Sequence, residues 1–267
     1  MFNLTLTLHG TLKSGEKFTQ EIDPKIEKLF LDNKQLTQID LTPLRECKNL
    51  EMLLLSSNFL EDIYLVPLRG CENLEVLCLS DNRLKDIDLT PIGQCEKLKE
   101  LRLVQNELMS INLKPLSTCK ELRFLYLGGN QLTMLNLNPL KHLKKLAWLE
   151  LDGNKLVYLD LEPLMQCENL NNIDLGSNAL TSIDLGPLSF LKKLETINLD
   201  ENNFESVDIS PLRACESLRY VSIPREMIAW NDSVLNEKEL PEFLRRRLLK
   251  VIKAARDVYL KGQKKEF

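Results

Sequence analysis

Apolar residues recur along most of the chain with a fixed spacing of 24 residues. Counted from Leu36, apolar side chains occupy the same eight phases in eight consecutive units, and the last unit ends at Ile223. A proline marks the same period without any insertion from Pro43 to Pro211. A fixed period of a few tens of residues indicates an array in which each unit stacks on the next.

Within one unit the pattern predicts a short strand and, on the far side, a tight turn. Leu53 and Leu55 alternate with variable residues, which predicts a strand with one buried face. Pro43 opens a segment in which apolar residues recur every third position from Leu44, as in a short 3₁₀ or α turn. Since one strand cannot bury its face alone, the units must stack into a parallel sheet. The far-side element is wider than a strand, so we expect the stack to curve with its sheet on the inner, concave face.

This unit resembles the leucine-rich repeat (LRR) over roughly residues 26–226. The strand motif stands at five positions of the second copy: Leu50, Leu53, Leu55, Asn58 and Leu60. The resemblance implies an α/β fold, a leucine-rich repeat solenoid of the intracellular type with eight 24-residue repeats. Such a solenoid is a curved horseshoe arc with a parallel β-sheet on the concave face and short 3₁₀ or α turns on the convex face.

One asparagine per unit keeps a further phase from Asn58 to Asn202. An amide can both donate and accept, so it can satisfy backbone groups where the chain leaves the strand and turns inward. We therefore expect these asparagines to be structural.

The two ends differ from the repeats. Residues 1–25 do not follow the period, and Asn3–His9 with Lys17–Ile22 predict a β-hairpin cap that covers the first edge of the sheet. Residues 26–226 form the predicted solenoid. Residues 227–267 are expected to form a C-terminal helical cap whose helix opens at Pro241.

The predicted C-terminal helix has a basic face. Its members are Arg245, Arg246, Arg247, Lys250, Lys253 and Arg256. Residues 242–267 hold nine basic and three acidic side chains, so the rest of a chain of net charge −4 carries −10. Two interpretations stay open: a solvated face on a capping helix, or an electrostatic tether that binds an anionic membrane or nucleic acid. The near balance of 39 acidic and 35 basic residues argues against bulk nucleic-acid binding.

Six of the seven cysteines share one repeat phase. They are Cys47, Cys71, Cys95, Cys119, Cys167 and Cys215, and the same phase carries Leu143 and Leu191 in two other units. Leucine can replace a packed thiol, but neither a metal ligand nor a disulfide partner. These cysteines are therefore predicted to be core residues of a protein in the reducing cytoplasm. The seventh, Cys78, lies at an outward position of a strand and is expected to be an exposed thiol.

An aspartate precedes the proline turn in five units, at Asp40, Asp88, Asp160, Asp184 and Asp208. Either the column holds calcium, or each carboxylate assists its own turn. Calcium takes about six to eight converging oxygens, whereas one outward carboxylate per unit offers too few. The turn interpretation is therefore preferred, and no metal is expected.

The candidate binding residues alternate with the buried leucines of the strands, so they line the predicted concave face. They are Phe30, Met52, Leu54, Val76 and Cys78 in the first units, Arg102, Phe124, Tyr126 and Trp148 in the centre, and Glu150, Asp152, Asp174 and Asp200 in the later units. Tryptophan, tyrosine and arginine dominate the energetics of protein interfaces. We expect a partner to place apolar groups on the aromatic centre and basic groups against the acidic half.

Enzymatic activity has little support in the sequence. The chain lacks a glycine-rich phosphate loop, a nucleophile elbow and a zinc-binding helix motif, and its only histidines are His9 and His142. No run of 18 apolar residues occurs, and the first twenty residues lack the pattern of a secretory leader, so we expect no secretion by a classical signal. We expect a cytoplasmic, monomeric scaffold that binds another protein and needs no cofactor, as the resemblance also implies; a membrane surface is the less favoured partner.

Overall fold

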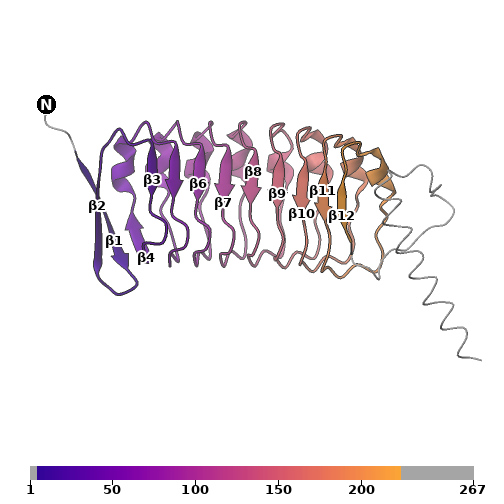
Figure 1. Cartoon of the computed structure of the whole chain (residues 1–267), viewed down its shortest axis with the longest axis horizontal. Helices are drawn as coiled ribbons and strands as arrows, with labels where there is room; N and C mark the ends of the chain where they lie inside the picture. Colours follow the sequence, from indigo (N-terminus) through magenta and orange to yellow (C-terminus); the bar gives the residue numbers. More distant parts are fainter. Residues whose placement is uncertain (1–4, 224–267) are drawn as a thin grey trace, which may run out of the picture.

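The protein is an elongated solenoid whose strands lie side by side along its long axis (Figure 1). A computed structural model describes residues 5–223. Nine strands form one parallel sheet: β3 (Lys28–Phe30), β5 (Met52–Leu54), β6 (Val76–Cys78), β7 (Glu100–Arg102), β8 (Phe124–Tyr126), β9 (Trp148–Glu150), β10 (Asn172–Asp174), β11 (Thr196–Asn198) and β12 (Tyr220–Ser222). Each residue pairs with the one 24 positions later, as Leu101 does with Leu125, so the repeat period sets the register.

A short 3₁₀ helix lies on the far side of each repeat. The eight helices are η1 (Thr42–Glu46), η2 (Val66–Gly70), η3 (Thr90–Gln94), η4 (Lys114–Thr118), η5 (Asn138–Leu140), η6 (Glu162–Gln166), η7 (Gly186–Phe190) and η8 (Ser210–Ala214). Each has a proline at its first or second position, where the missing N–H costs no hydrogen bond. The predicted parallel sheet and tight turns are thus confirmed.

The core is one continuous column of aliphatic side chains between the sheet and the 3₁₀ helices. Leu53, Leu125 and Leu164 are fully buried, as are the equivalent residues in most other units. Burying a leucine contributes roughly 1.5–3 kcal/mol. No single repeat can gain this without its neighbours, so the stack is held together by its leucines.

The asparagine column ties each repeat to the one before it. Asn106 Oδ1 accepts a hydrogen bond from Leu84 N at 3.1 Å, and Asn106 Nδ2 donates to Leu79 O at 3.0 Å. The same bond to a leucine N–H of the preceding repeat recurs at all seven asparagines. The predicted structural role of these asparagines is confirmed.

The six in-phase cysteines are buried free thiols. Cys95 Sγ lies 3.6 Å from Leu68 O and Cys215 Sγ lies 3.2 Å from Leu188 O, and five of the six thiols point at a carbonyl of the preceding 3₁₀ helix in this way. The first, Cys47, points at Pro43 O of its own helix. Burial raises the pKa of Cys95 to about 12, which keeps the thiol protonated and unreactive. Their predicted place in the core is confirmed.

The aspartate column assists its turns. Asp40 Oδ1 accepts a hydrogen bond from Thr42 N at 2.8 Å, and Asp88, Asp160, Asp184 and Asp208 make the equivalent bond. Hydrogen bonds from Thr42 hold the pKa of Asp40 below its usual value. These contacts agree with the turn interpretation.

The N-terminal hairpin is present but pairs differently from the expectation. Strands β1 (Leu6–Leu12) and β2 (Lys17–Ile22) are antiparallel. On its other side β1 pairs with β4 (Leu36–Asp40), which lies between β3 and η1 in the chain. The prediction that the hairpin covers the edge of the concave sheet is therefore wrong, because β3 ends the nine-stranded sheet. The hairpin instead covers the end of the apolar core, where Leu8 is fully buried.

The predicted C-terminal cap falls outside the described residues. This applies to residues 227–267 and to the basic positions Arg245, Arg246, Arg247, Lys250, Lys253 and Arg256.

Candidate protein-binding face

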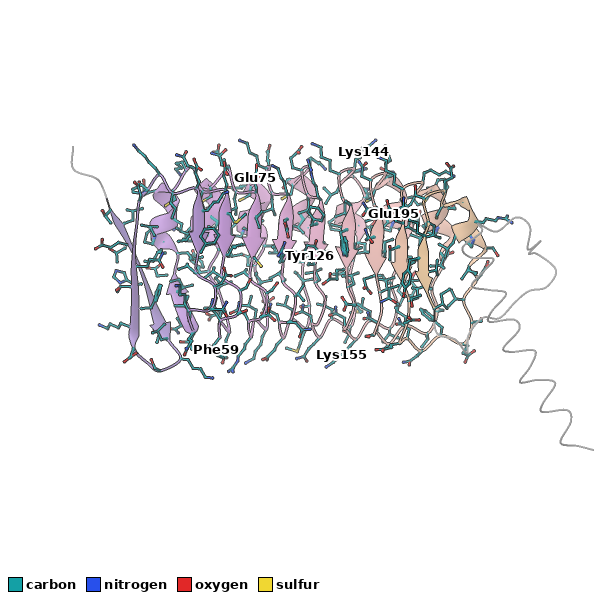
Figure 2. All side chains as sticks on the ribbon, viewed as in Figure 1. Phe59, Glu75, Tyr126, Lys144, Lys155 and Glu195 are labelled. Atoms are coloured by element: carbon teal, nitrogen blue, oxygen red, sulfur yellow. The ribbon has the colours of Figure 1, made fainter. Side chains whose placement is uncertain are left out.

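The outward side chains of β3 and β5–β12 form one surface, which we call the sheet face. In each three-residue strand the middle residue points into the core and the other two point outward, as Leu125 is buried between half-exposed Phe124 and Tyr126. Figure 2 shows Tyr126 within the row of strands, with Phe59 and Lys155 at one margin of the sheet and Lys144 at the other. The predicted candidate residues are outward residues of these strands, except Asp152 and Asp200, which follow β9 and β11 by two residues.

Three rings gather at the centre of the sheet face, and we call Phe124, Tyr126 and Trp148 the aromatic cluster. The Phe124 and Tyr126 rings are parallel with centroids 6.2 Å apart, and Tyr126 lies 6.2 Å from Trp148 at a tilt of 47°. Phe124 stands directly opposite Trp148 across the β8–β9 ladder. All three are half-buried and share one open surface.

Trp148 carries a polar group that the described residues leave unsatisfied. Its indole Nε1 is buried and has no hydrogen-bond partner among residues 5–223. A buried N–H without an acceptor costs roughly 1–3 kcal/mol. Trp148 is thus held at the centre of the face at a cost to stability.

Arg102 borders the aromatic cluster on the β7 side. Its guanidinium carbon lies 5.6 Å from the Tyr126 ring centroid, within the range of a cation–π contact. Its Nε also donates to Glu100 Oε1, which sits two residues earlier on the same strand. Arg102 is therefore already paired, and Glu100 is a face residue that sequence reasoning did not single out.

Three carboxylates adjoin the aromatic cluster on the other side, and we call Glu150, Asp152 and Asp174 the carboxylate trio. Glu150 pairs with Tyr126 on one side and with Asp174 on the other. Burial, followed by repulsion from Asp152 and Asp174, raises the pKa of Glu150 to about 7. Burial, with Asp174 as the next cause, also raises the pKa of Asp152. Crowded negative charge on a partly desolvated surface is the electrostatic signature of this region.

Two glycines lie beside the carboxylate trio and leave space that its side chains occupy. Gly128 and Gly176 occupy the Asp152 column on the adjacent strands, and a Cβ at Gly128 would collide with the Asp152 carboxylate. Asn198 Nδ2 donates to Asp174 Oδ1 at 2.8 Å. Asp200 lies in the same column as Asp152 and accepts a hydrogen bond from Ser222 Oγ. The acidic region therefore extends toward β12 but is partly engaged there.

The first repeats present an apolar strip of Phe30, Met52, Leu54 and Val76. Phe30 is 55% exposed and the other three are half-exposed. Leu54 pairs with Phe30 across the β3–β5 ladder. The expected apolar surface of units one to three is present, next to the edge strand of the sheet.

Cys78 does not belong to this exposed strip, and its prediction as an exposed thiol is wrong. The residue is 5% exposed. Its short side chain stands between Leu54 and Arg102, which are longer, and its Sγ lies 2.9 Å from Ser56 Oγ. Alternation predicted the direction of the side chain correctly, but neighbours on the adjacent strands cover it.

Sequence reasoning missed a second exposed group away from the sheet face. Met109, Met134, Val157 and Tyr158 are 53–79% exposed. They occupy the two phases that follow the Leu36 position in three successive repeats, a pattern that was visible in the sequence. These four residues provide matched controls for the sheet face.

Metal chemistry finds no support in the described part of the chain. Residues 5–223 contain no group of three His, Cys, Asp or Glu side chains arranged to hold a metal ion. In the same range, no helix is long and apolar enough to cross a membrane. The open groups on the sheet face are rings and carboxylates, which suit non-covalent recognition.

Several solved structures resemble this chain. An LRR protein of Leptospira interrogans has a TM-score of 0.62 at 26% identity, over 69% of this chain and 47% of that one. Internalin C2 of Listeria monocytogenes has a TM-score of 0.61 at 28% identity, over 76% and 84% of the two chains. The LRR ectodomain of the Arabidopsis thaliana receptor kinase GASSHO1/SCHENGEN3, solved in complex with CASPARIAN STRIP INTEGRITY FACTOR 2, has a TM-score of 0.64 at 24% identity, over 73% and 24%.

The chain spans about half the length of the Leptospira structure and 56% of an internalin F structure from Listeria monocytogenes. A search of curated protein sequences gives no match. The family model for the leucine rich repeat matches residues 24–84, 96–156 and 166–226, and a second model for two repeats matches residues 72–117. These matches cover most of the solenoid, and the protein belongs to the leucine-rich repeat family.

Proposed function

We propose that this protein is a non-enzymatic interaction module that binds another protein on its sheet face. The observation that carries the proposal is the aromatic cluster: three adjacent rings, half-exposed, at the centre of an otherwise regular sheet. Contiguous exposed apolar area usually marks a binding site, because a solvated surface gains nothing from it.

The arrangement around the cluster supports the same function. Apolar side chains lie on one side of the rings and carboxylates on the other, so the face offers both burial and charge. Aromatic residues in the centre of a patch, with polar groups at its rim, are the usual anatomy of a protein interface. The LRR fold is commonly a protein-interaction module, and the Arabidopsis ectodomain was solved in complex with another factor.

A reducing compartment such as the cytoplasm is part of this proposal. All seven cysteines are free and buried, and the in-phase thiols point at backbone carbonyls, where they serve as packed groups. We also propose that the module acts as a single chain and uses no cofactor.

The test is capture from a cell lysate with the full chain, followed by mass spectrometry. A Tyr126→Ala, Trp148→Ala double variant is expected to lose proteins that the wild type retains. Tyr158→Ala is the control, because Tyr158 is an exposed ring away from the sheet face. Unchanged capture by a folded double variant would remove the proposal.

A further inference from the structure

The carboxylate trio is a cluster of negative charge on the sheet face that no ion pair neutralises within residues 5–223. Glu150 and Asp174 are direct cross-strand neighbours, about 4.8 Å apart along the sheet, and Asp152 follows two residues after Glu150. No Lys or Arg within residues 5–223 forms an ion pair with any of the three. Arg102 stands on β7, two strands from Glu150, and is paired with Glu100 on its own strand. Its charge opposes the rise in the pKa of Glu150 but is the smallest of the causes.

Glycines in the neighbouring repeats make space for these carboxylates. Gly128 and Gly176 flank Asp152 along the array and carry no side chains of their own. The carboxylates of Asp152 and Glu150 lie over Gly128, where a Cβ would collide with them. The Asn198 amide and the Asp174 carboxylate lie over Gly176 in the same way.

The aromatic cluster begins where the carboxylate trio ends. Tyr126 is the cross-strand partner of Glu150, and Trp148 lies two residues before Glu150 on β9. Rings and carboxylates are thus about 5–7 Å apart, the spacing of neighbouring positions on a sheet. An arginine or lysine side chain matches this spacing, because its aliphatic stem packs on rings while its charged end reaches acceptors.

We propose that the partner presents an arginine or lysine to the carboxylate trio, from a segment whose adjacent apolar side chain packs on the aromatic cluster. This inference rests on the proposed function and narrows it to a basic-apolar segment of a separate protein. Charge complementarity selects this occupant: residues outside 242–267 carry a net charge of −10, which attracts cationic segments during encounter.

A peptide-display selection on the full chain tests the chemistry of the partner directly. The probe is a random 12-residue peptide library. Enriched peptides are expected to contain Arg or Lys next to an aromatic or aliphatic residue. Their affinity should fall at least tenfold for a Glu150→Gln, Asp152→Asn, Asp174→Asn variant and should weaken as salt is raised.

A charge-matched control separates a local effect from a general one. Asp62→Asn, Asp86→Asn, Glu205→Gln removes three carboxylates that lie off the sheet face. This variant should bind the selected peptides within about twofold of the wild type, since distant surface charges are screened. An equal loss in both triple variants would overturn the proposal, because it would indicate bulk attraction.

The outcomes distinguish this inference from the proposed function. Peptides that need Tyr126 and Trp148 but lack basic residues and bind the trio variant normally would overturn the inference and leave protein binding on the sheet face intact. A selection with no peptide dependent on those two rings would overturn both.

The chain's own basic C-terminal segment is the competing occupant. A full-length variant with Arg245→Gln, Arg246→Gln and Arg247→Gln is therefore selected in parallel. If basic peptides are enriched on this variant alone, the occupant is the chain's own segment, and the proposal of a separate partner is overturned. Equal enrichment on both forms supports a separate partner.

Discussion

The interior and the sheet face of this solenoid share a period but differ in how they use it. Inside, the Leu125 and Asn106 positions hold the same kind of residue in nearly every repeat and make the same contacts. On the sheet face, the Tyr126 position holds eight other residue types in the other repeats, from phenylalanine and leucine to arginine, glutamate and serine. Stacking demands identical interior contacts at every step, whereas an outward side chain contacts only its neighbours. The face is therefore free to differ from repeat to repeat.

The two regions also differ in how well their polar groups are satisfied. Interior residues satisfy each other, and the buried asparagines leave few backbone groups unpaired. The face retains an indole N–H at Trp148 that no residue of 5–223 accepts, and a crowded set of carboxylates around Glu150. Unfavourable features confined to one surface are typical of a binding site, where they are offset on association.

The largest effect is expected from the interior. Asn106→Ala removes hydrogen bonds to Leu84 N and Leu79 O. Leu84 N loses its acceptor inside the core, whereas Leu79 O keeps the bond from Asn82 Nδ2. The free energy of unfolding should fall by about 3 kcal/mol. Urea denaturation followed by circular dichroism measures it. Asn73→Ala is the control, because the Asn73 amide makes an exposed bond, and it should cost about 1 kcal/mol or less. Equal costs would mean that the asparagine column does not hold the repeats together.

Truncation of a side chain on the sheet face should reduce binding more than stability. Trp148→Ala is expected to weaken binding of the captured partner by about 30-fold, or about 2 kcal/mol, because central aromatic residues dominate interfaces. Stability should change by less than binding does, since Trp148 is half-exposed and loses an unsatisfied N–H. Calorimetric titration and urea denaturation of one preparation give both values. If the variant loses stability but binds normally, Trp148 has a structural role and not a binding role.

The carboxylates of the sheet face should make the stability of the protein depend on pH. The folded pKa of Glu150, about 7, lies above the ordinary value of 4.5, so its favourable contribution is complete below pH 4.5 and is lost as pH rises through 7. Glu150→Gln should therefore flatten the decline in stability between pH 5 and 8. The difference should be about 1 kcal/mol after solvent screening of a half-exposed group. Denaturation curves at each pH test this, and the exposed Glu205→Gln variant should follow the wild type.

The smallest effect is expected from an exposed ion pair that lies neither in the interior nor on the sheet face. Lys144 and Glu168 form an ion pair between adjacent repeats at 2.8 Å, yet both side chains are about two-thirds exposed. Lys144→Ala should leave the unfolding midpoint unchanged within error, because exposed ion pairs contribute little. A measurable loss would show that repeated spacing on the surface also stabilises the stack.

The sequence predicted the interior well because stacking requires the same interior residues in every repeat, so each feature appears many times along the chain. The strand phase, the proline turns, the asparagine bonds and the six core cysteines all follow from a period repeated eight times. The backbone just before each asparagine was harder to predict: it is left-handed in seven repeats, with glycine only at Gly129 and Gly153 and residues such as Ser57 and Gln105 elsewhere. Without glycine at the position, composition gave no sign of that conformation.

The face and the ends were predicted less completely, because contacts between repeats decide them. Alternation placed Cys78 on the outward side, but the lengths of its neighbours determine that it is buried. The hairpin was recognised from its two strands. Its pairing with β4 depends on where the first repeat exposes the backbone groups of residues 36–40, which the sequence does not reveal. Alternation placed the aromatic cluster on one outward face, but the contacts between its rings depend on the register of β8 and β9, which sets Phe124 opposite Trp148.

Site-specific photocrosslinking tests most directly whether the variable face, and not another surface, binds the partner. Benzoylphenylalanine is placed in the full chain at Tyr126 or at Tyr158, two partly or largely exposed rings on different surfaces. Irradiation in lysate is expected to crosslink the captured partner from position 126 and not from position 158. Crosslinks from position 158, or equal yields from both, would contradict the assignment of binding to the sheet face.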